Sequence, residues 1–237
     1  KSAEHHARSA LAKGQKLVAK APWGTSGTQN KRIQSENDLQ TGPLTGWLRN
    51  TIEAQGQIVL EPWLDRVADL SMQLEVLPGG EIKLLGARQF LTGNQFEYRG
   101  SLLDASLSGL TPEARKFLHQ PHSPTLASPL ERWRELARAL GKTLSQRGYE
   151  GPAGIDAMIW RDLDGSFKLK PLVELNPRWT MGRIALELEA KVLPGVSARW
   201  FFIPIRSLPD ARTFVEKVSQ AHPLQTVPAG GGTRIAS

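Results

Sequence analysis

Apolar and polar positions alternate along the segment PLVELNPRW, which runs from Pro171 to Trp179. Successive side chains of a β-strand point to opposite faces of the sheet. A strand here therefore places these side chains on one face: Leu172, Glu174, Asn176 and Arg178. The other face carries Val173 and Leu175. The alternation predicts a strand with one apolar face and one face that bears a carboxylate, an amide and a guanidinium.

The rest of the chain mixes helical spacing with strand spacing. Helical periodicity and end signals predict helices over residues 2–13, 44–56, 128–148, 181–191 and 209–220. Apolar runs bounded by turn residues predict strands over residues 16–20, 58–64, 70–76, 81–90, 154–160, 167–176 and 198–205. Short elements mixed in this way indicate an α+β fold, with two small, mainly antiparallel sheets favoured over one parallel sheet. The glycine-rich end, residues 227–237, is expected to be mobile.

The second predicted helix shows the clearest buried stripe. Its apolar side chains recur at helical spacing: Leu44, Trp47, Leu48 and Ile52. We expect all four to face the core, and we expect the helix to end at Gly56, because glycine readily adopts the left-handed conformation of a helix C-terminus.

Composition narrows the class of protein. The chain has 237 residues of which 40% are hydrophobic, enough to bury a core. Cysteine is absent, which excludes disulfides and thiolate metal sites. No apolar run approaches the ~20 residues that span a bilayer, and the first residues lack the apolar stretch of a signal peptide. We therefore expect a soluble, cytoplasmic protein with no membrane partner.

The positive net charge does not by itself identify the class of binding partner. The net charge is +7 and the pI about 9.9, which suits a nucleic acid, an anionic substrate or simply a basic surface. Basic residues are interspersed with acidic ones, as in ERWRELARALGKTLSQR, and this pattern is typical of a solvated helix face. No zinc ligand set or RNA-binding strand motif accompanies the charge, so a nucleic-acid partner is the less favoured alternative.

Two carboxylates are expected to meet on the late pair of strands. A hairpin turning at residues 162–166 places Asp156 opposite Leu172 or Glu174, so that in either register Asp156 and Glu174 lie opposite or diagonal on one face. Carboxylates that close repel each other, and a proton, a basic side chain or a divalent cation relieves the repulsion. With Asn176 as a third oxygen donor, the pattern suits Mg²⁺ or Mn²⁺. The alternative is a surface sheet face with a salt bridge from Glu174 to Arg178.

A second cluster follows the first predicted strand. Lys20 ends the strand KLVAK, and the following loop contains Gly24 and Gly27 among the hydroxyl side chains of Thr25, Ser26 and Thr28. A cation, a closely approachable backbone and several N–H and O–H donors suit phosphate oxygens. The glycines are not followed by GKS or GKT, so this is not a Walker A loop, and an ordinary polar hairpin loop has a similar composition.

Three motifs in order resemble those of the ATP-grasp superfamily: LVAKAPWGTSGTQNKRI, IVLEPWL and VELNPR. They are most similar to the branch that contains biotin carboxylase and carbamoyl phosphate synthetase. The resemblance covers residues 17–189 and implies two α+β subdomains with a nucleotide cleft between them. The small subdomain would comprise residues 1–60 and the large one residues 61–237. A preceding N-terminal domain, usual in the family, is absent here, so a partner domain or partner chain is expected.

The resemblance implies a role for each residue that matches a motif. Lys20 would contact the ATP phosphates. A loop closing over them would be formed by Trp23, Gly24, Thr25, Ser26, Gly27 and Thr28. The adenine and ribose would be bound by the residues that follow the second motif's glutamate and by that glutamate itself: Glu61, Pro62, Trp63, Leu64 and Asp69.

The remaining implied roles concern metal and catalysis. Asp156, Glu174 and Asn176 would hold Mg²⁺ or Mn²⁺. Arg178 would bind the substrate carboxylate or the acyl phosphate, and Arg88 would reach a phosphate or the reacting group. With Lys20, these two arginines form the implied catalytic set.

The resemblance favours an ATP-dependent ligase that joins a carboxylate to an amine or a thiol through an acyl phosphate. A non-catalytic ATP-binding module, or a fragment that needs a partner domain, is the alternative. A nucleic-acid binder is the least favoured of the three.

Overall fold

The computed structural model describes residues 2–23, 30–40, 42–93, 97–121, 123, 125–196, 198–204, 208–229 and 232–236. The chain folds into two compact units. One comprises Lys1–Asp65 and Gly93–Glu97, and the other comprises Arg66–Thr92 and Tyr98–Ser237. Among the described residues, none of the helices is both long and apolar enough to cross a membrane.

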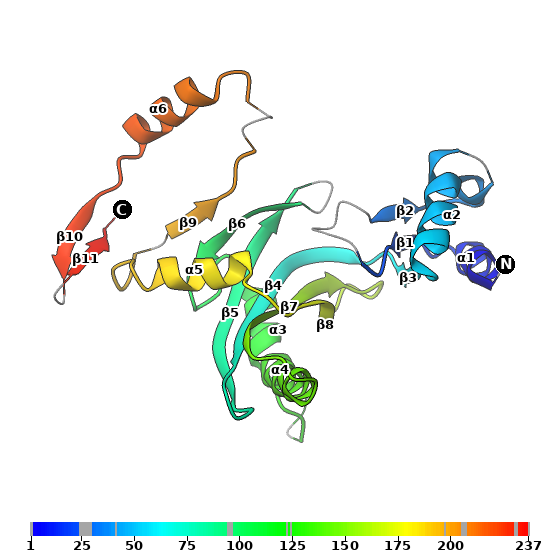
Figure 1. The fold of residues 1–237 in the computed structure, drawn as a ribbon, viewed down its shortest axis with the longest axis horizontal. Helices are drawn as coiled ribbons and strands as arrows, with labels where there is room; N and C mark the ends of the chain where they lie inside the picture. The colour runs from blue at the N-terminus through cyan, green and yellow to red at the C-terminus, as the bar shows by residue number, and fades with distance from the viewer. Residues whose placement is uncertain are drawn as a thin grey trace. The chain divides into compact units, whose positions relative to one another are not determined.

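The first unit packs helices on a small antiparallel sheet (Figure 1). The sheet has the order β2-β1-β3, with β1 (Leu17–Lys20), β2 (Lys31–Ile33) and β3 (Val59–Pro62). The helices are α1 (Ser2–Ala12), α2 (Pro43–Gln55) and the short 3₁₀ helix η1 (Glu36–Leu39). Side chains from all six elements share one apolar core around Ala19 and Ile33, both fully buried.

One predicted core residue of this unit lies at the surface. Leu44, Trp47 and Leu48 of α2 pack against the core as expected, and Gly56 ends the helix in the left-handed conformation. Ile52 is instead 40% exposed. The buried stripe continues through Thr51, seven residues after Leu44, and Ile52 lies beside that stripe.

The second unit is built on a six-stranded sheet of order β8-β7-β4-β5-β6-β9. Its strands are β4 (Asp65–Val76), β5 (Ile82–Thr92), β6 (Tyr98–Leu103), β7 (Gly151–Arg161), β8 (Phe167–Asn176) and β9 (Ala198–Phe201). The pairs β4–β5, β5–β6, β6–β9 and β7–β8 are antiparallel. The α+β class with mainly antiparallel sheets is thus confirmed, although the described strands form three sheets rather than two, and this one is large.

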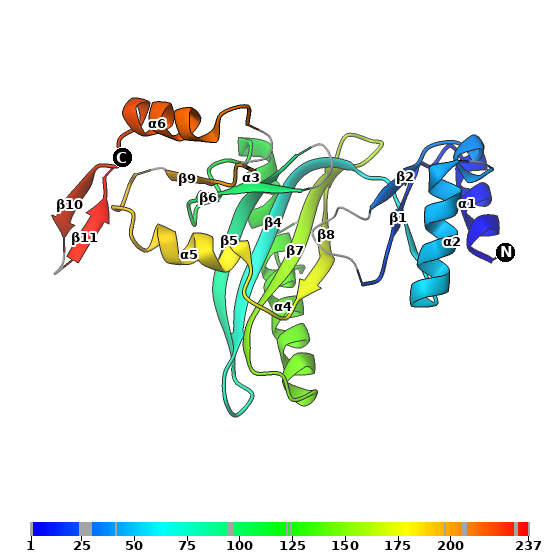
Figure 2. The same ribbon diagram turned by 45° about the horizontal axis from the view of Figure 1, so that its top comes forward.

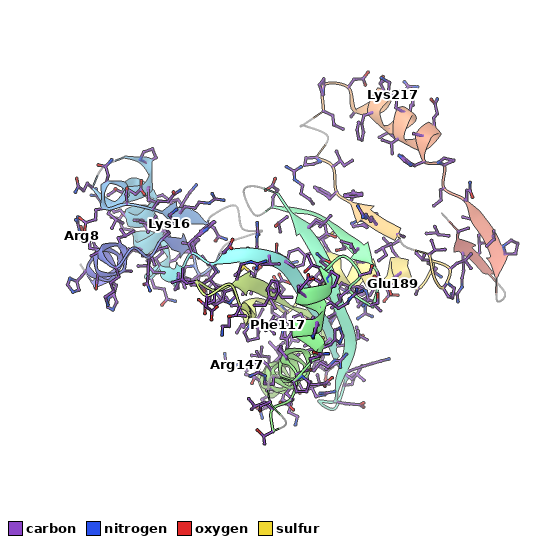
Figure 3. The ribbon with its side chains drawn as sticks, turned by 180° about the vertical axis from the view of Figure 1, so that it is seen from behind. Arg8, Lys16, Phe117, Arg147, Glu189 and Lys217 are labelled. Carbon is purple, nitrogen blue, oxygen red and sulfur yellow. The ribbon has the colours of Figure 1, made fainter. Side chains whose placement is uncertain are left out.

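Strand β4 is covered on both faces, with a different chemistry on each. Its apolar side chains, Ala68, Leu70, Met72, Leu74 and Val76, join a core with α3 (Pro112–His119) and α4 (Pro129–Gln146). Figure 3 views the molecule from this side and labels Phe117 of α3, which packs against that core. The alternate side chains of β4 are polar: Asp69, Ser71, Gln73 and Glu75. They point to the face that carries α5 (Met181–Glu189), seen over the sheet in Figure 2.

The register between β7 and β8 combines both predicted pairings. Asp156 lies opposite Glu174, whereas Met158 lies opposite Lys170, and the register shifts between these two positions. An irregularity of this kind gives one strand an extra residue and bends it. The carboxylates therefore face each other directly across the two strands.

The C-terminal region departs from expectation. Residues 227–237 were expected to be mobile, but β10 (Thr226–Ala229) and β11 (Gly232–Ile235) pair as an antiparallel hairpin after α6 (Ala211–Ala221). Ile235 anchors it, because its N–H donates to Lys191 O at 2.7 Å and its carbonyl accepts from Leu193 N at 2.9 Å. These backbone bonds to the segment after α5 give the glycine-rich stretch a partner that its composition does not reveal.

The contact between α5 and the sheet yields a test of the fold. Gly182 of α5 lies against Gln73, so that a Cβ at this position would overlap the amide nitrogen of Gln73. We expect Gly182→Ala to lower the free energy of unfolding by roughly 1–3 kcal/mol in urea denaturation, the usual cost of overpacking. Gly46→Ala in α2, where a Cβ meets nothing within 4 Å, is the matched control and should be neutral or stabilising by about 0.5–1 kcal/mol. Equal stability of the two variants would contradict the packing described.

Candidate functional site

The polar face of the six-stranded sheet centres on Asp156 of β7. Ser71 Oγ donates a hydrogen bond to Asp156 Oδ1 at 2.7 Å, and Asn176 Nδ2 donates to Asp156 Oδ2 at 3.3 Å. Glu174, exposed on β8, is the register partner of Asp156. The structure therefore brings together the three side chains that the sequence placed on one face: Asp156, Glu174 and Asn176.

The electrostatics of Asp156 oppose its ionisation. Burial raises the pKa of Asp156 from 3.8 to about 6. The hydrogen bond from Ser71 lowers this pKa and the charge of Arg178 does so slightly, whereas the charges of Glu174 and Asp69 raise it further. A desolvated carboxylate with carboxylate neighbours is stabilised by a proton or by a bound cation.

Arg178 follows the end of β8 and contacts Asn176 rather than Glu174. Its Nη2 donates to Asn176 Oδ1 at 3.0 Å, and its Nη1 donates to Trp179 O at 3.2 Å. In the part of the chain that the structure describes, no ion pair joins Arg178 to Glu174. The salt-bridge alternative for this face is therefore not supported.

The donor set at Asp156 suits a hard divalent cation. Two carboxylates and one amide offer the oxygen ligands that Mg²⁺ and Mn²⁺ prefer. The described residues hold no group of three or more His, Cys, Asp or Glu side chains placed for a metal ion, and the third donor here is the amide of Asn176. The repulsion between Asp156 and Glu174 gives such an ion a favourable position, so the two carboxylates fit Mg²⁺. Asn176 turns its Nδ2 to Asp156 and its Oδ1 to Arg178, so its amide would have to turn over to offer the ion an oxygen. The role of all three residues as ligands stays a prediction.

Asp69, predicted to contact a ribose, lies on the same face of β4 near Asp156. Thr92 Oγ1 donates to Asp69 Oδ2 at 2.8 Å, and Arg66 Nη1 lies 3.1 Å from the same oxygen. Burial raises the pKa of Asp69, while Arg66 and Thr92 act in the opposite direction. The ribose contact stays a prediction.

Arg88, predicted to reach a phosphate, is buried in an ion pair. Its Nε pairs with Glu189 Oε2 at the end of α5, and its Nη1 donates to Ala87 O at 2.5 Å. Glu189 Oε1 also accepts from Ala105 N at 3.0 Å; Figure 3 labels Glu189. Burial lowers the pKa of Arg88, and Glu189 raises it. In this conformation Arg88 ties β5 to α5, and a contact with phosphate would require it to leave Glu189.

In the first unit, two predicted nucleotide contacts pair with each other. Lys20 Nζ lies 2.6 Å from Glu61 Oε2, each with about a fifth of its side chain exposed. The antiparallel register of β1 and β3 explains the contact, because Lys20 lies opposite Val59 and Glu61 opposite Val18, which places both on one face.

The remaining predicted nucleotide contacts follow Glu61 or precede the loop. Pro62 ends β3, Leu64 is half-buried, and Trp63 donates its N–H to Lys16 O at 2.7 Å. Trp23 is 80% exposed, and its N–H donates to Gln55 Oε1 at 3.0 Å. The expected phosphate loop Gly24, Thr25, Ser26, Gly27 and Thr28 lies outside the described residues. The nucleotide roles of all these residues stay predictions.

Sequence reasoning missed three polar residues that adjoin the site. Ser71 and Gln73 are 4% and 1% exposed on β4, and Thr180 precedes α5. Gln73 Nε2 donates to Ser71 Oγ at 2.7 Å, and Thr180 Oγ1 donates to Gln73 Oε1 at 2.7 Å. The alternation within LSMQLEV was a signal for Ser71 and Gln73, and a threonine before a helix was a signal for Thr180.

The raised pKa of Asp156 predicts a pH-dependent effect of its removal. A carboxyl group whose folded pKa lies above its unfolded value contributes stability at low pH, and this contribution is lost as the pH rises from about 4 to about 6. In EDTA, we expect Asp156→Asn to exceed wild type in free energy of unfolding at pH 7–8, by on the order of 2 kcal/mol. The difference should vanish at pH 4. A variant less stable than wild type at pH 8, measured by urea denaturation, would contradict the description.

Comparisons with known proteins show what this chain resembles. No protein-family model matches the sequence. The chain is 27% identical over 188 residues to the butirosin acyl-carrier protein–L-glutamate ligase of Niallia circulans, and the match covers 79% of this chain and 39% of the relative. The chain thus spans about two fifths of the length of that curated relative.

One solved structure supports the fold. N5-carboxyaminoimidazole synthetase from Staphylococcus aureus, complexed with ADP, matches with a TM-score of 0.53 at 13% identity, covering 94% of this chain and 54% of that chain. Biotin carboxylase from Campylobacter jejuni matches with a TM-score of 0.47 at 17% identity, covering 76% of this chain and 35% of that chain. The curated relative and the synthetase are both ATP-grasp proteins. This chain has the ATP-grasp fold.

Proposed function

We propose that this chain is the nucleotide-binding part of an ATP-dependent ligase that joins a carboxylic acid to an amine or a thiol. The observation that carries the proposal is the pair of facing carboxylates, Asp156 and Glu174, with Asn176 and Arg178 beside them. An all-oxygen donor set next to a guanidinium suits a site that handles phosphates and a carboxylate. The ATP-grasp fold and the sequence likeness to a ligase support the same activity.

The residues of the polar face would bind and orient the reactants. Asp156, Glu174 and Asn176 would hold Mg²⁺, which when bound neutralises charge on the ATP phosphates and the transferred phosphoryl group. Arg178, exposed at the end of β8, would orient the substrate carboxylate through paired N–H donors. Holding the carboxylate oxygen against the γ-phosphate is the main contribution that such a site makes to the rate.

The proposed reaction has two steps. A carboxylate oxygen attacks the γ-phosphorus of ATP, the bond to the bridging oxygen breaks, and ADP leaves with the electron pair. The resulting acyl phosphate is then attacked at its carbonyl carbon by the amine or thiol, which loses a proton, and inorganic phosphate leaves.

The pair of Lys20 and Glu61 would exchange partners when nucleotide binds. In the present structure the ammonium and the carboxylate neutralise each other. The phosphates would take the ammonium of Lys20, and the adenine amino group would donate to Glu61. Each side chain would then trade one partner for another of the same character, which keeps both groups satisfied.

A second candidate is a nucleotide-binding module whose catalysis needs a further domain. The observation that favours it is length, because the chain spans 39% of the curated ligase and 54% of the ADP-bound synthetase. The two candidates differ in whether an acyl phosphate forms on this chain alone.

Trapping with hydroxylamine tests the ligase directly. We expect the full chain to form a hydroxamate from at least one acid in a panel, with a matching release of ADP that requires Mg²⁺. L-glutamate enters the panel first, because the curated relative is named as an L-glutamate ligase. Binding of ADP without hydroxamate from any acid would contradict the ligase and favour the module.

Replacing Glu174 tests whether this side chain is a metal ligand or has only a structural role. Glu174→Gln keeps the shape and removes one of two repelling charges, so the melting temperature without ligand should be unchanged or higher. The rise in melting temperature that Mg²⁺ with ADP produces in wild type should be lost.

Glu150→Gln, an exposed acidic residue just before β7, is the matched control and should keep the full ligand-induced rise. If Glu174→Gln melts well below wild type without ligand, yet gains as much from Mg²⁺ with ADP, Glu174 is not a metal ligand.

A further inference from the structure

A chain of four hydrogen bonds leads from the start of α5 to the carboxylate of Asp156. Arg183 N donates to Thr180 Oγ1 at 3.2 Å, and Thr180 Oγ1 donates to Gln73 Oε1 at 2.7 Å. Gln73 Nε2 then donates to Ser71 Oγ, and Ser71 Oγ donates to Asp156 Oδ1, both at 2.7 Å. Each of the three side chains between the two ends, Thr180, Gln73 and Ser71, both accepts and donates, so all of the donors point toward Asp156.

The direction of this chain follows from chemistry. An ionised carboxylate only accepts, so the single hydroxyl proton of Ser71 is committed to Asp156. The oxygen of Ser71 must then accept, which turns the NH₂ group of Gln73 toward it and the carbonyl of Gln73 toward Thr180. Thr180 must in turn donate to Gln73, and its remaining lone pair caps α5. Aligned bonds of this kind polarise and strengthen one another.

The packing around Gln73 leaves its amide little freedom. A Cβ on Gly154 of β7 would lie 3.2 Å from Gln73 Nε2 and 3.3 Å from Oε1, and a Cβ on Gly182 of α5 would overlap Nε2. The amide is therefore held between two glycines, one on a neighbouring strand and one on the helix above. With Gln73 1% exposed and Ser71 4% exposed, water does not compete for these bonds.

We propose that Ser71 and Gln73 are positioning residues that set the orientation of the Asp156 carboxylate for a divalent cation. The inference rests on the proposed function, in which Asp156 is a metal ligand. Ser71 holds Oδ1 toward the interior of the sheet, so that Oδ2 remains on the side of Glu174 and Asn176. Through Thr180 the same series of hydrogen bonds links this orientation to the start of α5. Groups that hydrogen-bond a metal ligand in this way usually change metal affinity 10- to 100-fold when removed.

The test measures how the binding of ADP depends on Mg²⁺, by calorimetry on the full chain. For Ser71→Ala we expect a rise of roughly tenfold or more in the Mg²⁺ concentration that gives half of the Mg²⁺-dependent gain in ADP affinity. The affinity for ADP in EDTA should stay within about twofold of wild type, because Ser71 acts on the ion through Asp156 and not on the nucleotide. Ser71→Thr restores the hydroxyl and should return the Mg²⁺ dependence to within about threefold of wild type.

Two further variants keep the outcome decisive. Gln73→Met removes the donor to Ser71 with little change of volume. We expect the Mg²⁺ concentration at half effect to rise a few-fold, because Ser71 keeps its bond to Asp156 but loses the hydrogen bond from Gln73. Should Ser71→Ala fail to fold, a wild-type Mg²⁺ dependence in Gln73→Met overturns the proposal by itself. Ser101→Ala is the control, because Ser101 is a fully buried serine of the same sheet that bonds Tyr98 and lies outside the chain of bonds.

The possible results separate this inference from the proposed function. If wild type binds ADP with no dependence on Mg²⁺, both fail together. If wild type depends on Mg²⁺ and Ser71→Ala depends on it equally, the inference alone is overturned. The inference is also overturned if Ser71→Ala loses as much affinity for ADP in EDTA as in Mg²⁺. The same holds if Ser101→Ala loses as much affinity as Ser71→Ala, because either result indicates general damage to the sheet.

Discussion

The burial of strand β4 on both faces is the constraint on which the second unit depends. Its apolar face packs on α3 and α4, and its polar face lies under α5. A slip of one residue in register would move Ser71 and Gln73 into the apolar core, at the cost of leaving buried polar groups unpaired. The core residues on one face, Leu70, Met72 and Leu74, therefore hold the polar groups of the other face in place.

The negative charge on the polar face is only partly neutralised. Asp156 is desolvated beside Glu174 and Asp69, and its pKa is raised to about 6 as a result. Hydrogen bonds from Ser71 and Asn176 partly offset this cost. Two other acids of this face have a basic partner: Glu75 lies 3.0 Å from Arg183 and Asp69 lies 3.1 Å from Arg66. The residual charge around Asp156 is what a divalent cation would complete, and this is how the fold and the proposed chemistry are connected.

Local pattern predicted much of this arrangement. The alternation in PLVELNPRW placed Glu174 and Asn176 on one polar face, and hairpin symmetry placed Glu174 opposite or diagonal to Asp156; in the structure the two lie opposite each other. Only the bulge, which lets both candidate registers occur in one pair of strands, was beyond a symmetric argument. The helix at Pro129–Gln146 also begins as expected, with Ser128 accepting from Glu131 N.

What sequence could not supply were contacts between distant segments. Gln73 and Thr180 are 107 positions apart, and no periodicity links them. The ion pair of Arg88 with Glu189 likewise depends on how α5 lies across β5, which the sequence does not reveal. The hairpin at the C-terminal end was missed for a similar reason, because its composition favours mobility while its partner lies after α5.

The central claim is that the polar face around Asp156 binds a divalent cation together with nucleotide. Paramagnetic broadening of amide NMR signals by Mn²⁺ in the presence of ADP locates such an ion directly. The account predicts that the amides of Ile155 and Leu175, beside Asp156 and Glu174, broaden at the lowest Mn²⁺ concentration, while Ala137 on the buried face of α4 is affected only later. Broadening that begins elsewhere in the chain, or that leaves Ile155 and Leu175 sharp at saturating ADP, would contradict it.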